Sequence, residues 1–140
     1  MTVASIMSRS VVTIEPTRTL ADVAALLSER RIGAAVVTGV EGKLAGIISE
    51  RDVVRAVARE GAAALALPVA SCMTRNVVTC VPATLITQVM SIMTEGKFRH
   101  LPVIENDRLV GIVSIGDVVK RRLSDTEAES AAMRDYIASA

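Results

Sequence analysis

The sequence predicts an α+β fold in which two similar units pack as a pseudo-twofold pair, followed by a C-terminal helical tail. The first observation is an internal repeat, because residues 3–16 return as residues 69–82 and residues 44–54 return as residues 109–119. A repeat is sought first because it determines the whole architecture. The second observation is an apolar fraction of 51% that is almost entirely aliphatic, with one Phe, one Tyr and no Trp. This composition suits buried strands covered by helices. Two copies of one unit imply pseudo-twofold symmetry, and we expect a functional cleft between the copies.

The first copy begins with a short β-prone run at residues 11–14, which Pro16 closes. An amphipathic helix follows, with apolar side chains at i, i+3, i+4 and i+7 counted from Leu20. Thr19 and Asp22 have the spacing of a capping box at the start of this helix. The sequence therefore predicts a strand followed by a capped helix.

A β-hairpin follows, with strands at residues 34–37 and 44–49 joined by a turn at residues 39–42. A second helix is expected to start near Glu50. The same order of strand, helix, strand, strand and helix returns in the second copy. Its expected elements are strands at residues 77–80, 101–104 and 109–114, a helix with an apolar stripe from Ile86, and a helix starting near Ile115.

These elements divide the chain into a first unit at residues 1–60, a connector at 61–68, a second unit at 69–123 and a tail at 124–140. The connector is rich in alanine, so one or two helical turns are as consistent with it as a loop. The tail carries residues that could line one face of a closing helix, namely Ala128, Ala132, Met133, Tyr136 and Ile137. We expect that face to pack either on the two units or on a second chain.

The charge balance excludes some classes of partner. Sixteen basic and fifteen acidic residues give a net charge of +1, with no basic stripe. Nucleic-acid binding usually needs both positive charge and a reading surface, so we expect no nucleic acid partner.

The longest apolar stretch, residues 62–70, is interrupted by Pro68 and is far shorter than the roughly 20 residues that span a bilayer. With no signal-like opening segment, we expect a cytoplasmic protein without membrane insertion.

The sequence contains no residue pattern typical of a metal site or of a catalytic site. Cys72 and Cys80 occupy the repeat positions that Ile6 and Ile14 hold in the first copy, so we interpret them as small hydrophobic residues. Their spacing matches no zinc motif, and we expect no metal site. The chain has one His and lacks the nucleophile-elbow, zinc-protease and phosphate-loop motifs. We therefore predict no catalytic residues, no catalytic cofactor and no enzymatic activity.

The strongest local pattern is a strand followed by Ser-x-x-Asp at a helix start, and it occurs at Ser49–Asp52 and again at Ser114–Asp117. One interpretation is a capping box, which contributes on the order of 1 kcal/mol. The other interpretation is a nucleotide site. A helix N-terminus attracts anions, and a carboxylate in the first turn is suited to the adjacent hydroxyls of a ribose. Gly46 and Gly111 could permit close approach of a ligand, although packing explains them equally well.

The order, spacing and duplication of these motifs resemble the cystathionine-β-synthase (CBS) domain, and the tandem arrangement resembles the CBS pair called a Bateman module. The resemblance covers roughly residues 3–123. The matching pieces are Met7 with residues 11–13 (Val-Val-Thr), Met73 with residues 77–79 (Val-Val-Thr), residues 98–103 (Phe-Arg-His-Leu-Pro-Val) and the Gly-x-x-Ser-x-x-Asp stretches at 46–52 and 111–117.

The resemblance implies two βαββα units packed sheet to sheet, with two clefts that bind adenosine compounds such as AMP, ADP, ATP, S-adenosylmethionine or NAD. Of these ligands we expect AMP, ATP or NAD. The family's ribose-binding Asp corresponds to Asp52 and Asp117, and its Ser/Thr near the ribose and phosphate corresponds to Ser49 and Ser114. The strand beside the adenine corresponds to Thr13 and Thr79.

The two copies differ near the expected clefts. Arg51 of the first copy could bind a phosphate or lie on an exposed helix turn, whereas Gly116 takes its place in the second copy. Arg99 and His100 stand where the first copy has Gly33 and Ala34. The family tends to place basic residues there near phosphates, although His100 could equally be a surface strand residue. We expect the clefts to differ in affinity or ligand.

Since the repeat leaves no length for an attached catalytic domain, we predict a stand-alone nucleotide sensor that acts in trans on an unknown regulated protein. The family also implies a homodimer. The alternative is a structural or interaction dimer that binds no physiological nucleotide.

Overall fold

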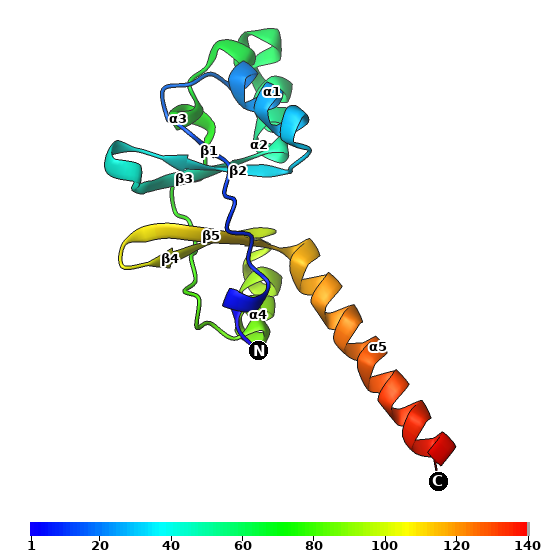
Figure 1. Cartoon of the computed structure of the whole chain (residues 1–140). Coiled ribbons are helices and arrows are strands. Elements are labelled where there is room, and N and C mark those ends of the chain that lie inside the picture. Colours follow the sequence, from blue (N-terminus) through cyan, green and yellow to red (C-terminus); the bar gives the residue numbers. More distant parts are fainter. Residues whose placement is uncertain (140) are drawn as a thin grey trace.

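The computed structural model describes residues 1–139 and contains two small sheets with helices on their outer sides (Figure 1). The first sheet has the strand order β1-β2-β3, in which β1 is parallel to β2 and β2 is antiparallel to β3. Its elements are β1 (Thr13–Ile14), α1 (Leu20–Arg30), β2 (Ala34–Thr38), a 3-10 turn (Val40–Gly42), β3 (Leu44–Ser49) and α2 (Glu50–Glu60). The predicted order of the first unit is confirmed.

The second unit has the same order except that its first strand is missing, and its smaller sheet consists of the antiparallel strands β4 and β5. The predicted connector forms a 3-10 helix, so it is helical rather than a loop. The elements are the 3-10 helix Gly61–Ala66, α3 (Val69–Cys72), α4 (Ile86–Gly96), β4 (His100–Glu105), β5 (Arg108–Ser114) and α5 (Ile115–Ser139). The fold class, an α+β pair of similar units with a C-terminal helix, is confirmed.

The prediction of a strand at residues 77–80 is wrong, because only Cys80 forms a parallel bridge there, to Val103. In the first unit the equivalent contact includes a hydrogen bond from the Val36 N–H to the Val12 carbonyl, at 3.0 Å. The residue that corresponds to Val36 is Pro102, which has no N–H to donate. The expected strand at residues 77–80 is therefore reduced to the single bridge between Cys80 and Val103.

The two units exchange their N-terminal segments, residues 3–8 and 69–74. Val3 and Met7 lie in the core of the second unit, whereas Val69 lies in the core of the first. Each exchanged segment also pairs with the edge of the sheet that receives it. The Ser8 N–H donates to the Ile112 carbonyl at 2.8 Å, and the Thr74 N–H donates to the carbonyl of Ile47 at 2.9 Å.

Gly46 and Gly111 make this exchange possible because the segments cross directly over them. A Cβ on Gly46 would lie 2.6 Å from the Thr74 carbonyl oxygen and 2.8 Å from the Met73 sulfur. A Cβ on Gly111 would lie 2.8 Å from the Met7 sulfur. Real Cβ atoms do not approach other atoms this closely. Packing against the exchanged segments, rather than a ligand, therefore accounts for both glycines.

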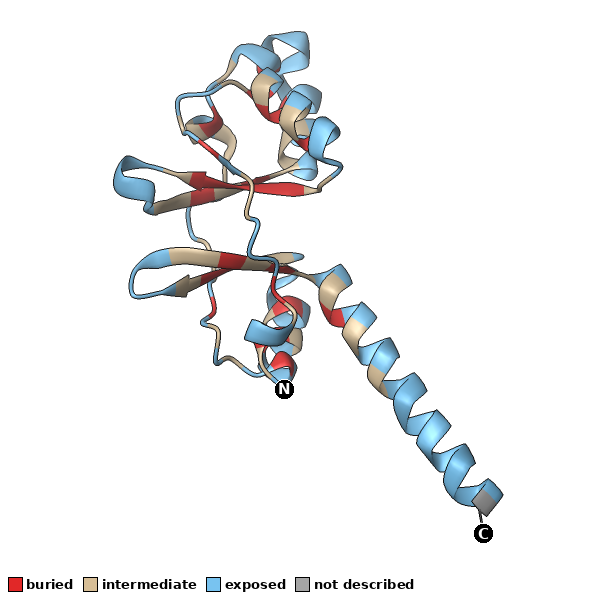
Figure 2. Ribbon diagram, viewed as in Figure 1, coloured by how far each residue is buried: buried red, intermediate tan, exposed pale blue. Residues whose placement is uncertain are grey.

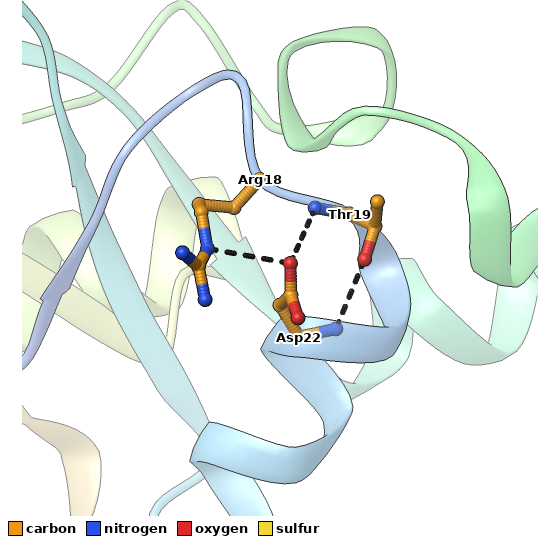
Figure 3. A network of polar contacts seen from close by, with 3 residues as sticks. All are labelled: Arg18, Thr19 and Asp22. Carbon is orange, nitrogen blue, oxygen red and sulfur yellow. Dashed lines mark hydrogen bonds and ion pairs between the residues drawn. The ribbon is translucent and has the colours of Figure 1, made fainter.

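The predicted capping box at the start of α1 is confirmed (Figure 3). The Thr19 N–H donates to Asp22 Oδ2 at 3.1 Å, and the Asp22 N–H donates to Thr19 Oγ1 at 3.2 Å. The Arg18 guanidinium lies 3.3 Å from the same carboxylate oxygen. Hydrogen bonds from the Thr19 backbone and hydroxyl hold the pKa of the Asp22 carboxyl below its usual value.

Helix α5 is one uninterrupted helix that leaves the second sheet and projects away from both units (Figure 1). The predicted tail is therefore a continuation of the second unit's last helix. All side chains from Thr126 to Ala138 are exposed (Figure 2). The tail does not pack on the two units of its own chain, which was one of the two expectations, and residue 140 lies outside the described residues.

Candidate functional site

The first Ser-x-x-Asp pattern forms a capping box where β3 meets α2. The Ser49 N–H donates to Asp52 Oδ2 at 2.9 Å, and the Asp52 N–H donates to Ser49 Oγ at 3.3 Å. The Ser49 hydroxyl also donates to Asp52 Oδ2, at 3.0 Å. Within the described residues, the other oxygen of the carboxylate, Oδ1, accepts no hydrogen bond. A carboxylate has about four acceptor positions, so capping leaves Asp52 able to accept from a ligand.

The second pattern repeats this geometry where β5 meets α5. The Ser114 N–H donates to Asp117 Oδ2 at 3.0 Å, and the Asp117 N–H donates to Ser114 Oγ at 3.1 Å. Both aspartates are partly buried at the first turn of a helix, where the backbone N–H groups favour a negative charge. Capping and ligand binding are thus compatible roles rather than exclusive ones at each helix start.

A cleft of about 460 Å³ lies between the first of these helix starts and the second unit. Its volume is within the range of small-molecule sites, which is roughly 300–1,000 Å³. The first unit contributes Gly33, Ala34, Ile47, Ser49, Glu50, Arg51, Asp52 and Arg55, while Thr74, Gly96, Lys97, Phe98, Arg99 and His100 come from the second half of the chain. A ligand in this cleft would therefore contact both units at once.

The cleft carries an excess of positive charge. Its cationic side chains are Arg51, Arg55, Lys97 and Arg99, and its carboxylates are Glu50 and Asp52. All four cations are exposed, so they can turn toward a bound anion without losing a buried partner. Guanidinium groups bind phosphate oxygens in a bidentate manner, which makes this wall suited to a phosphorylated ligand.

His100 lies at the boundary between the two units. A Cβ on Gly33 would lie 3.7 Å from His100 Cε1, so the imidazole packs beside the backbone of the first unit. Burial lowers the pKa of His100 below its usual value, and the Arg99 charge adds to this effect, whereas the carboxylates of Asp117 and Glu50 oppose it. Carboxylates from both helix starts, Glu50 and Asp117, therefore interact electrostatically with this imidazole.

The structure brings together five of the predicted site residues, which are Ser49, Arg51, Asp52, Arg99 and His100. Ser114 and Asp117 occupy the equivalent helix start of the second unit and do not line this cleft.

The two predicted threonines lie elsewhere. Thr13 lines a separate hollow of about 500 Å³ beside α1, together with Arg18 and Asp22. Thr79 is exposed next to the bridge residue Cys80. Neither threonine lines the cleft that contains Asp52.

The lining residues that were not predicted include Arg55, Lys97, Phe98 and Thr74. Arg55 could have been found from its i, i+4 spacing to Arg51 on α2. Lys97 follows α4 in the left-handed conformation, with φ of 56°. Thr74 reaches the cleft only because its segment is exchanged, and no sequence pattern reports that exchange.

Among residues 1–139, no group of three or more metal-ligating side chains could hold a metal ion. Likewise, none of the helices in this part of the chain is long and apolar enough to cross a membrane.

Two similar units, each a small sheet faced by helices and each with an aspartate at a helix start, define a tandem-repeat α+β class of protein. The CBS domain profile matches residues 3–59 and again residues 69–124. The chain therefore belongs to the CBS domain family, with two copies of the domain.

Comparisons with individual proteins agree with this assignment. The mitochondrial CBS domain-containing protein CBSX3 of Arabidopsis thaliana is 34% identical over 85% of this chain, which spans 60% of that relative's length. The solved CBS-domain containing protein ATU1752 of Agrobacterium tumefaciens is 51% identical, with a TM-score of 0.79 over 82% of this chain and 86% of its own.

A third comparison concerns a liganded structure. The CBS domain pair of protein MJ0100, solved in complex with 5-methylthioadenosine and S-adenosyl-L-methionine, is 25% identical. Its TM-score is 0.83 over 89% of this chain and 98% of its own.

Proposed function

We propose that this chain is a regulatory module that binds an adenine nucleotide in the cleft between its two CBS domains. The observation that carries the proposal is the cleft itself, in which a partly free Asp52 carboxylate and a cationic wall from both units face one space. The carboxylate suits a ribose diol, and the cations suit one or more phosphates. The adenosine ligands of the MJ0100 pair support the same ligand class.

The regulatory part of the proposal follows from the position of the cleft. Ser49 and Asp52 belong to the first unit, whereas Arg99 and His100 belong to the second. A ligand that bridges them favours the arrangement of units that it fits best, and a change in arrangement can be transmitted to a partner protein. We propose that the module acts in trans in this way, without catalysis. A cytoplasmic location stays a prediction, and the relative CBSX3 is mitochondrial.

Isothermal titration with AMP, ATP, NAD and S-adenosylmethionine tests the ligand. The variant Asp52→Asn keeps an oxygen for the helix cap but removes the charge, so we expect binding to weaken by about 1–3 kcal/mol. Asp22→Asn is the matched control, because Asp22 forms the same capping box on α1 outside the cleft. It should leave affinity unchanged.

Two outcomes contradict the proposal. One is the absence of heat with all four compounds at millimolar concentration, which favours an interaction dimer without a nucleotide. The other is equal affinity of the Asp52→Asn and wild-type proteins, which leaves Asp52 with a capping role alone. Hydrogen exchange should also slow at residues 49–55 and 96–100 together when ligand binds, since both segments line the cleft.

A further inference from the structure

We propose that the protruding part of α5 is a docking surface for a second copy of this chain, with the two helices antiparallel and centred near Thr126. The starting point is that residues 126–138 are exposed on every side. A helix segment of this length is marginal in water without tertiary contacts, since most helical stability in proteins comes from packing one face. One i, i+4 ion pair, Arg121 to Asp125 at 3.3 Å, lies at its base.

One stripe of α5 has the spacing of a packing face. Its positions follow one another by three or four residues, which places them on the same side of a helix. They are Ile115, Val119, Arg122, Thr126, Glu129, Met133 and Ile137. The four apolar members are 44%, 50%, 60% and 66% exposed, in chain order, so all of them still present apolar surface to solvent.

The apolar residues of the stripe are spaced symmetrically on either side of Thr126. Val119 and Met133 each lie seven residues from Thr126, and Ile115 and Ile137 each lie eleven residues from it. Between these apolar pairs are two opposite charges, Arg122 and Glu129, on either side of the centre. A surface that matches its own reverse is what a twofold antiparallel interface requires.

Antiparallel pairing satisfies both the apolar and the charged positions. It places Val119 beside Met133 of the second copy, and Arg122 within reach of Glu129 of the second copy, and each contact occurs twice by symmetry. Parallel pairing would instead set Arg122 beside its own equivalent and Glu129 beside its own equivalent, which is repulsive. Within one chain, Arg122 and Glu129 are seven residues and about 10 Å apart along the axis, too far to pair with each other.

The outer part of this stripe, from Thr126 to Ile137, does not pack on its own chain. α5 is continuous from Ile115 to Ser139 and points away from both sheets (Figure 1). The stripe also lies outside the nucleotide cleft, whose lining residues end at His100. The proposal is therefore independent of the proposed function.

A charge-exchange experiment on the full chain tests the pairing. Sedimentation equilibrium should show a dimer for the wild type and a dimer weakened by about tenfold for either R122E or E129R, since each change turns two attractive pairs into repulsive ones. The double variant R122E/E129R should regain wild-type affinity. An equimolar mixture of the two single variants should form heterodimers, because each chain then complements the other.

Circular dichroism of each variant confirms that the chain is folded. A K120E variant is the matched control, because Lys120 is exposed on α5 but lies off the stripe, and its change should leave dimer affinity within about twofold. A monomeric wild type, an equally strong dimer in both single variants, or failure of the double variant and the mixture to recover would each overturn the antiparallel pairing. A chain ending at Leu123 that dimerises as strongly as the full chain would also overturn it.

Discussion

Replacement of Gly46 by alanine should destabilise the fold, because the added methyl group would meet the exchanged segment. The new Cβ would lie 2.6 Å from the Thr74 carbonyl oxygen, whereas ordinary contacts begin near 3.4 Å. That oxygen accepts the Ile47 N–H at 3.0 Å, so it cannot retreat without lengthening a hydrogen bond. Overpacking of this kind costs about 1–3 kcal/mol.

Part of this cost is offset, because a Gly-to-Ala change reduces the entropy of the unfolded chain by about 0.4–1 kcal/mol. The net loss should be about 1–2 kcal/mol, which lowers the urea midpoint by roughly 0.5–1 M for an m-value of about 2 kcal/mol/M. Gly116→Ala is the matched control. Its nearest contact would be an ordinary 3.6 Å to Ser114 Oγ, and alanine is the better helix former.

Urea unfolding followed by circular dichroism measures both variants. Gly46→Ala should unfold at a lower midpoint than the wild type, and Gly116→Ala at an equal or higher one. An unchanged midpoint for Gly46→Ala would refute the argument that the exchanged segment crosses directly over this glycine.

Three further changes have outcomes that follow from burial. Burial lowers the folded-state pKa of His100, so stability should fall as pH drops from about 6.5 through that lowered pKa, and urea midpoints of His100→Gln should lose this part of the pH dependence. Burial raises the pKa of the Cys80 thiol to about 11, so Ellman's reagent at pH 8 should modify Cys80 only after denaturant is added, whereas the partly exposed Cys72 reacts first. Val3→Ala removes a fully buried side chain from the core of the second unit and should cost about 1–3 kcal/mol in urea unfolding; a cost below about 0.5 kcal/mol would contradict that placement.

The repeat and the apolar periodicity were sufficient to predict the order of elements, because each strand and helix needs its own buried face. They also located the two helix starts, since Ser49–Asp52 and Ser114–Asp117 carry their capping signal locally. The absence of a strand at residues 77–80 could also have been predicted, but only by considering the residue opposite it. Pro102 lies opposite it, and a proline cannot supply the N–H that Val36 supplies in the first unit.

Two features could not be predicted from periodicity. The apolar pattern predicts that residues 3–8 and 69–74 are buried, but it does not say which unit buries them. The two segments have similar sequences, so either one could fit either core. The composition of the cleft depends on that same exchange, because Thr74 arrives with its segment. The position of Thr13 beside α1, away from the cleft, depends on which side of β1 faces the helix.

The exchange of segments also constrains how the chain can be made and divided. Residues 3–8 are synthesised well before β5, which carries the surface that they bind. The core of the first unit likewise includes Val69, so it cannot be completed until that residue has been synthesised. A fragment cut at the connector would hold one unit together with the segment that belongs to the other. Two identical single-repeat chains could trade these segments reciprocally, so the present chain has the form of a domain-swapped dimer joined into one polypeptide.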